Sequence, residues 1–132
     1  MQMIIFRQED VSINIDAHGN KIPLVTGNIL ISGKIFKGAT GGWGNGPLPA
    51  GLYKVEKAIK LADTPENALY KGDKFPWYAR ITPLFNTSRN GLLFHPKGKY
   101  VGTLGCIETW ERDEELFNLL TKIDIDCKLK VI

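Results

Sequence analysis

Hydrophobic and polar residues alternate through much of the first half of the chain, which is the pattern of half-buried β-strands. Residues 11–15 follow this period of two, and residues 17–20 (Ala-His-Gly-Asn) are typical of a hairpin turn. The turn predicts a second strand over 21–26. A further strand is predicted over 28–36, where Gly33 indicates a bulge.

The second half contains one segment with the period of an α-helix. Over residues 110–123 apolar side chains recur on one face, and Thr109 is placed to cap the start. The residues of this face are Leu116, Leu119, Leu120 and Ile123. Strands are predicted at 51–58, 77–84 and 127–131. The pattern therefore predicts a mainly β protein of the α+β class.

Size and composition limit the classes of protein that fit. The 132 residues suit a single domain spanning 1–132, and 43% apolar with 23% charged residues is ordinary for a globular chain. The net charge of +3 is scattered, unlike the basic stripe of a nucleic-acid-binding protein. No apolar run approaches the roughly 20 residues needed to cross a bilayer. We therefore expect neither a nucleic acid nor a membrane as partner.

Residues 1–10 lack both the basic start and the apolar stretch of a secretory signal. We expect synthesis in the cytoplasm, with any export following a route that does not read such a signal. Two cysteines do not make a disulfide scaffold. No metal or other cofactor is expected, because the histidines and cysteines lack the paired spacing of zinc ligands.

His95 and Cys106 are the candidate chemical groups. A histidine close to a cysteine can take the thiol proton and produce a nucleophilic thiolate. Gly105 removes a side chain beside the thiol, so the backbone N–H groups of Gly105 and Cys106 are candidates to hold an oxyanion. The alternative is a buried structural thiol and a core histidine. The residue pattern by itself leaves both interpretations open.

Two segments resemble the L,D-transpeptidase catalytic domain. Residues 103–106 (Thr-Leu-Gly-Cys), with His95 upstream, are similar to the family's Ser/Thr-x-Gly-Cys motif and its preceding histidine. Residues 49–53 (Pro-Ala-Gly-Leu-Tyr) resemble a Pro-x-Gly-x-Tyr strand start, and Arg89 falls where relatives often carry an arginine. The resemblance covers 46–109 and is nearest to small type VI secretion effectors and phage-encoded relatives.

The resemblance implies a compact β-sandwich with the helix packed on it. It implies that Cys106 attacks peptidoglycan stem peptides at the L–D bond, with His95 as base and with water, an amine or a D-amino acid releasing the thioacyl-enzyme. Thr103 would steady the histidine or its loop, and a backbone carbonyl would orient the imidazole. The residues expected at substrate are Arg89, Gly102, Trp43 and Lys97.

The same resemblance implies a context. A type VI effector is a toxin that acts in the periplasm or cell wall after non-classical export, with an immunity protein or a secretion component as partner. The glycine-rich segment 37–49 around Trp43 fits either a surface loop or a flap over substrate.

Two departures keep other classes open. Many transpeptidases carry a second histidine where this chain has Leu104, and Arg or Asn where it has Glu108. These differences affect how the site is oriented and how a substrate carboxylate is held. The alternatives are a non-catalytic cell-wall-binding module and a phage structural protein with a degenerate site.

Overall fold

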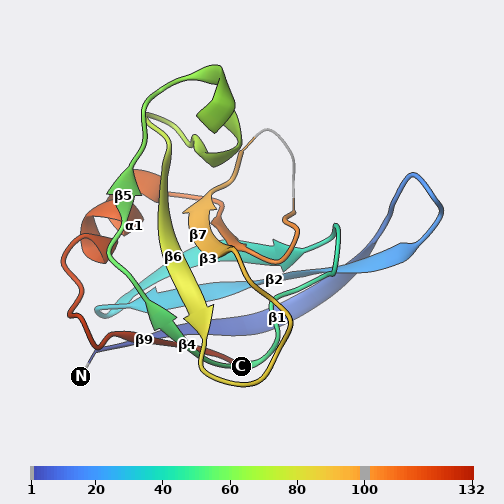
Figure 1. The fold of residues 1–132 in the computed structure, drawn as a ribbon, viewed down its shortest axis with the longest axis horizontal. Helices are drawn as coiled ribbons and strands as arrows, with labels where there is room; N and C mark the ends of the chain where they lie inside the picture. The colour runs from blue at the N-terminus through green and yellow to red at the C-terminus, as the bar shows by residue number, and fades with distance from the viewer. Residues whose placement is uncertain (1, 99–101) are drawn as a thin grey trace.

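The residues that the structure describes are mainly strand, with one α-helix and one 3-10 helix (Figure 1). The computed structural model describes residues 2–98 and 102–132. The strands are β1 (Met3–Ile15), β2 (Lys21–Ile31), β3 (Lys34–Gly41), β4 (Gly51–Val55), β5 (Ile59–Lys60), β6 (Trp77–Pro83), β7 (Leu92–Pro96), β8 (Ile107–Thr109) and β9 (Lys128–Val131). The helices are η1 (Pro65–Tyr70, 3-10) and α1 (Asp113–Leu120).

Eight of the nine described strands form a closed β-barrel. The order is β4-β9-β1-β2-β3-β8-β7-β6, and β6 pairs again with β4, while β5 extends β6 outside the ring. Most neighbours are antiparallel, but β1–β9 and β7–β8 are parallel. Figure 1 shows β6 crossing the β1–β3 strands.

The expectation of a sandwich was therefore wrong, although the mainly β class with one helix is confirmed. A sandwich has two sheets, each with its own edges. Here β4 pairs with β9 on one side and with β6 on the other, which joins the sheet into a ring. Closure removes edge strands that would otherwise expose unpaired backbone groups.

The hairpin at residues 17–20 is confirmed, but the strand predicted over 28–36 is interrupted. β2 ends at Ile31 and β3 begins at Lys34, with Ser32 and Gly33 between them. Both have positive φ, at 51° and 75°, as a two-residue hairpin turn requires. Gly33 therefore forms a turn and not a bulge.

The helix predicted over 110–123 is shorter at both ends. α1 covers Asp113–Leu120, because Arg112 adopts left-handed backbone (φ 46°) immediately before it. Thr109 is no cap: it lies in β8, and its hydroxyl donates to the Glu111 carbonyl oxygen at 3.0 Å. The predicted apolar face holds, since Leu116 and Leu120 are buried.

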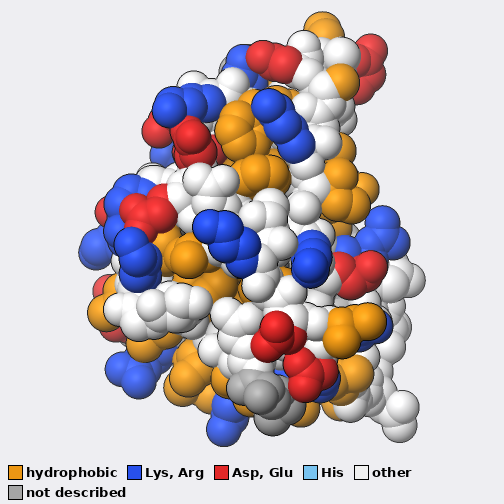
Figure 2. All heavy atoms as spheres, turned by 90° about the vertical axis from the view of Figure 1, so that its left-hand side faces the viewer, with side chains coloured by type: hydrophobic (Ala, Val, Ile, Leu, Met, Phe, Trp, Pro, Cys, Tyr) orange, Lys and Arg blue, Asp and Glu red, His pale blue; other side chains and the backbone are white. Residues whose placement is uncertain are grey.

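Charged side chains of both signs surround α1. Figure 2 shows Lys and Arg interspersed with Asp and Glu on the face at the left of Figure 1, and ion pairs Lys34–Glu115 and Lys74–Glu114 each measure 2.7 Å. The described side chains form no continuous basic stripe on this face. No helix among the described residues is long and apolar enough to cross a membrane.

The parallel pair β7–β8 determines the position of the candidate site. Phe94 opposes Ile107 and His95 opposes Glu108. Phe94 and Ile107 belong to the buried core, so the next side chains along each strand point to the outer face. Cys106 directly precedes β8 and lies two residues before Glu108, so the two side chains point to the same face. Three chemically active side chains therefore meet outside the barrel.

Candidate active site

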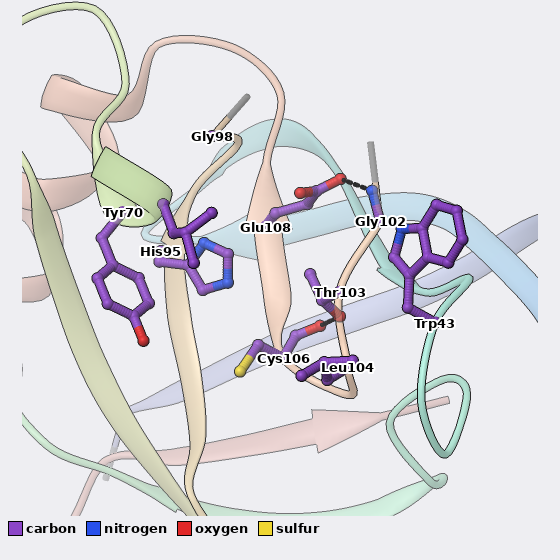
Figure 3. A pocket seen from close by; sticks show the side chains of 10 residues that line it. Trp43, Tyr70, His95, Gly98, Gly102, Thr103, Leu104, Cys106 and Glu108 are labelled. Atoms are coloured by element: carbon purple, nitrogen blue, oxygen red, sulfur yellow. Dashed lines mark hydrogen bonds between the residues drawn. The ribbon is translucent and has the colours of Figure 1, made fainter. Parts of the chain in front are cut away.

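A cavity of about 320 Å³ lies on this outer face of β7 and β8 (Figure 3). It is lined by Trp43, Leu69, Tyr70, His95, Gly98, Gly102, Thr103, Leu104, Cys106 and Glu108. The fold thus brings both candidate reactive residues, His95 and Cys106, to one cavity.

The His95 ring is fixed by a backbone carbonyl, as expected. Its Nδ1 lies 2.7 Å from the Pro96 carbonyl oxygen, which can only accept, so Nδ1 carries the proton of the neutral ring. The Tyr70 ring packs against the imidazole in a T-shaped arrangement, with 5.4 Å between the ring centroids. Burial lowers the His95 pKa, against a smaller raising effect of the Pro96 bond. The neutral ring leaves Nε2 able to accept a proton.

Cys106 is a half-buried thiol with a backbone partner. Its Sγ donates a weak hydrogen bond to the Gly91 carbonyl oxygen at 3.9 Å. Burial raises the Cys106 pKa, and a backbone hydrogen bond from Leu93 offsets part of the rise. Among the described residues no hydrogen bond joins the thiol to His95. The resting pair is therefore a neutral thiol beside a neutral imidazole.

Thr103 organises the loop that carries the thiol. Its hydroxyl donates to the Cys106 carbonyl oxygen at 2.6 Å and accepts from Gly41 N and Gly105 N, each at 3.1 Å. It makes no hydrogen bond to His95 among the described residues. Thr103 was expected to steady either His95 or the loop, and its hydrogen bonds are to the loop.

Gly105 is required by the backbone of this loop. Its φ is 138°, and a Cβ there would lie 3.0 Å from the Arg89 guanidinium. Because its N–H donates to Thr103, it is already engaged and is not a free oxyanion donor. This leaves the Cys106 N–H as the remaining candidate of the expected pair.

Trp43 and Gly102, which are expected at substrate, line the cavity. The Trp43 ring packs so closely over Gly102 that a Cβ on Gly102 would lie 2.9 Å from Trp43 Nε1. β3 extends to Gly41, so only the second part of the glycine-rich segment is loop.

Arg89 and Lys97, expected at substrate, lie outside the cavity. Arg89 donates to the carbonyl oxygens of Asn45 and Pro47 and lines a second hollow of about 380 Å³ together with Arg80. The Gly91 carbonyl that accepts from Cys106 belongs to the same hollow. Lys97 lines a third hollow, with Nζ 5.7 Å from the centre of the Trp110 ring.

Five lining residues were not among the predicted site residues, namely Leu69, Tyr70, Gly98, Leu104 and Glu108, and two of them carry polar groups. Glu108 was noted only as a departure from the family pattern, although its parity with Cys106 places both on one face. Tyr70 lies in η1, in a segment whose position over β7 no local pattern reveals. The other cysteine, Cys127, is fully buried in the core.

Comparison of the chain with family models, with curated proteins and with solved structures found no match.

Proposed function

We propose that the protein is a cysteine-dependent enzyme that modifies peptidoglycan stem peptides at the L–D bond, as the resemblance to L,D-transpeptidases implies. One observation carries the proposal. His95, with Nδ1 held by a carbonyl, and Cys106 line the same cavity although one lies in β7 and the other in the loop before β8. A base in a defined tautomer beside a nucleophile is the arrangement that acyl transfer uses.

The proposed reaction starts from the neutral pair. As Cys106 Sγ attacks the carbonyl carbon of the L–D peptide bond, its proton passes to His95 Nε2. The Cys106 backbone N–H stabilises the oxyanion of the tetrahedral intermediate. The C–N bond then breaks, the leaving amine takes the proton from the imidazolium, and a thioester remains. Water, an amine or a D-amino acid attacks the thioester and regenerates the thiol.

The surroundings supply groups for substrate. Trp43 and Tyr70 give the cavity aromatic walls, while Arg80 and Arg89 line the neighbouring hollow and suit a substrate carboxylate. Action in the periplasm or cell wall, non-classical export and an immunity or secretion partner belong to the proposal through the likeness to type VI effectors alone.

The second candidate is a binding module, or a phage structural protein, with a degenerate site. The observation in its favour is that neither reactive group is activated at rest: burial raises the Cys106 pKa, and no hydrogen bond joins the described thiol to the imidazole. Leu104, where many relatives carry a histidine, supports the same alternative.

Digestion of purified peptidoglycan separates these candidates. We expect wild type to shorten, cross-link or exchange the ends of stem peptides, and Cys106→Ala to leave them unchanged by mass spectrometry. His95→Ala should slow the reaction by about a hundredfold or more, as loss of a general base does. Cys127→Ala, which removes the other thiol, serves as the matched control and should stay active. An unaltered profile with wild type would favour the binding module.

A further inference from the structure

We propose that Glu108 is a binding residue for an ammonium group, so that the cavity beside Cys106 receives the amine-bearing part of a substrate. The inference deepens the proposed function and rests on it for the identity of that amine, which would be the acyl acceptor. Family members that carry Arg or Asn at this position would place the opposite or a neutral group there.

The Glu108 carboxylate is anchored through one oxygen. Oε1 accepts from the backbone N–H of Gly102 and from Trp110 Nε1, both at 2.8 Å. These two bonds fix the side chain, which is 1% exposed. Figure 3 shows the carboxylate between Gly102 and His95, with the second oxygen turned toward the His95 side.

That second oxygen, Oε2, lacks a protein partner. It is buried and accepts no hydrogen bond from the described residues. Leaving a buried carboxylate oxygen unpaired is costly, and a ligand that donates to it removes the cost. Glu108 lines the cavity, so such a donor can reach it from there.

The charged side chains near Glu108 leave its oxygen Oε2 available to a donor from a ligand. Burial raises the Glu108 pKa, and the hydrogen bonds from Trp110 and Gly102 and the positive charge of Lys97 offset part of this rise. Lys97 Nζ lies against the Trp110 ring, and among the described residues no ion pair joins it to the Glu108 carboxylate. Among the described lining residues Glu108 is the only acidic one, and the remaining walls are mainly apolar or aromatic. Aromatic walls with one carboxylate suit an ammonium group and disfavour an anion.

The thiol therefore lies between regions of opposite charge. Gly91, whose carbonyl oxygen accepts from the thiol, lines the second hollow together with Arg80 and Arg89. The cavity on the other side is lined by Glu108. A substrate with a carboxylate on one side of the reacting carbonyl and an amine on the other matches both. This arrangement favours release of the thioester by an amine over release by water.

Charge-selective labelling of Cys106 tests the inference without any catalysis. Cationic aminoethyl methanethiosulfonate and anionic sulfonatoethyl methanethiosulfonate both react by thiolate attack on the thiosulfonate sulfur, which forms a mixed disulfide and releases methanesulfinate. Rates are measured by mass spectrometry of the Cys106 peptide. The ratio of cationic to anionic rates, divided by the ratio for free cysteine, cancels any change in the thiol pKa.

We expect this ratio to exceed one in wild type and to fall by about tenfold in Glu108→Gln, the order of effect that a nearby, partly buried charge produces. Glutamine can still accept from Gly102 and Trp110. Glu108→Asp keeps the charge and should keep a ratio above one. Glu114→Gln removes an exposed carboxylate on α1 and should leave the ratio unchanged.

An equal ratio in wild type and Glu108→Gln, with both proteins shown to be folded by their thermal transitions, would overturn the inference. So would a wild type that the cationic reagent labels no faster than the anionic one. A protein inactive on peptidoglycan that keeps the Glu108-dependent preference would defeat the proposed function and leave ammonium binding standing.

Discussion

Burial sets the charge of both reactive side chains in the absence of substrate. It raises the pKa of the Cys106 thiol and lowers the pKa of the His95 imidazole, so each change favours the neutral form. Such a pair is suited to proton transfer during attack and not to a preformed thiolate–imidazolium ion pair. This differs from the thiolate that a histidine close to the cysteine was expected to produce.

The rate of Cys106 alkylation should therefore rise only at a pH above that at which free cysteine reacts. We expect the rate with iodoacetamide to rise with pH through a midpoint above the value of about 8.5 for free cysteine, since the folded protein disfavours the thiolate. His95→Ala should move the midpoint little, because the described ring makes no bond to the thiol. A midpoint well below 8.5 that His95→Ala raises would show an ion pair instead.

Thr103 should contribute to stability through its three hydrogen bonds. The hydroxyl is buried, so Thr103→Ala leaves Gly41 N, Gly105 N and the Cys106 carbonyl without this partner. We expect a loss of about 1–3 kcal/mol in the free energy of unfolding, measured with urea. Thr103→Ser retains the hydroxyl and should lose much less. Equal losses in the two variants would assign the effect to the methyl group.

At the scale of elements, local sequence patterns predicted those helices and strands whose position depends on residues adjacent in the chain. Alternation located the first hairpin and the strand near 77–84, and the apolar face located α1. The ends of elements were predicted wrongly where a positive φ at one or two residues ends or starts the element. Ser32 and Gly33 form a turn inside a continuous strand-like pattern, and the left-handed Arg112 makes α1 begin later than predicted. Such conformations depend on the partner strands and leave no period in the sequence.

Gly27 in β2 provides a test of the β1–β2 packing. A Cβ at this position would lie 2.1 Å from the Arg7 carbonyl oxygen and 2.8 Å from the Phe6 ring. We expect Gly27→Ala to destabilise the fold by about 3 kcal/mol in urea unfolding, the upper range of overpacking effects. Gly19→Ala, in the hairpin turn, meets open space at φ 81° and should lose only about 1 kcal/mol. A reversed order would contradict the β1–β2 geometry.

At the scale of the whole molecule, pairing between segments that are distant in the chain determines what the site contains. The sequence could indicate His95 and Cys106 because their residue types carry chemistry. Its two-residue spacing could place Glu108 on the face of Cys106, but not beside His95, because that depends on the parallel register of β7 and β8. It also could not show that Arg89 would be engaged by the carbonyls of 45–47, which are distant in the chain. Long-range pairing also decides between barrel and sandwich.

The central claim is that Cys106 becomes acylated by a stem peptide. The most direct measurement is intact-protein mass spectrometry after brief incubation with a synthetic tetrapeptide stem and acid quenching. We predict a mass increase equal to the acyl part of the peptide, on Cys106 in wild type and Cys127→Ala, and none in Cys106→Ala. Hydroxylamine should remove the adduct, as it cleaves thioesters. The absence of any adduct on wild type, over a range of peptide concentrations and times, would contradict the claim.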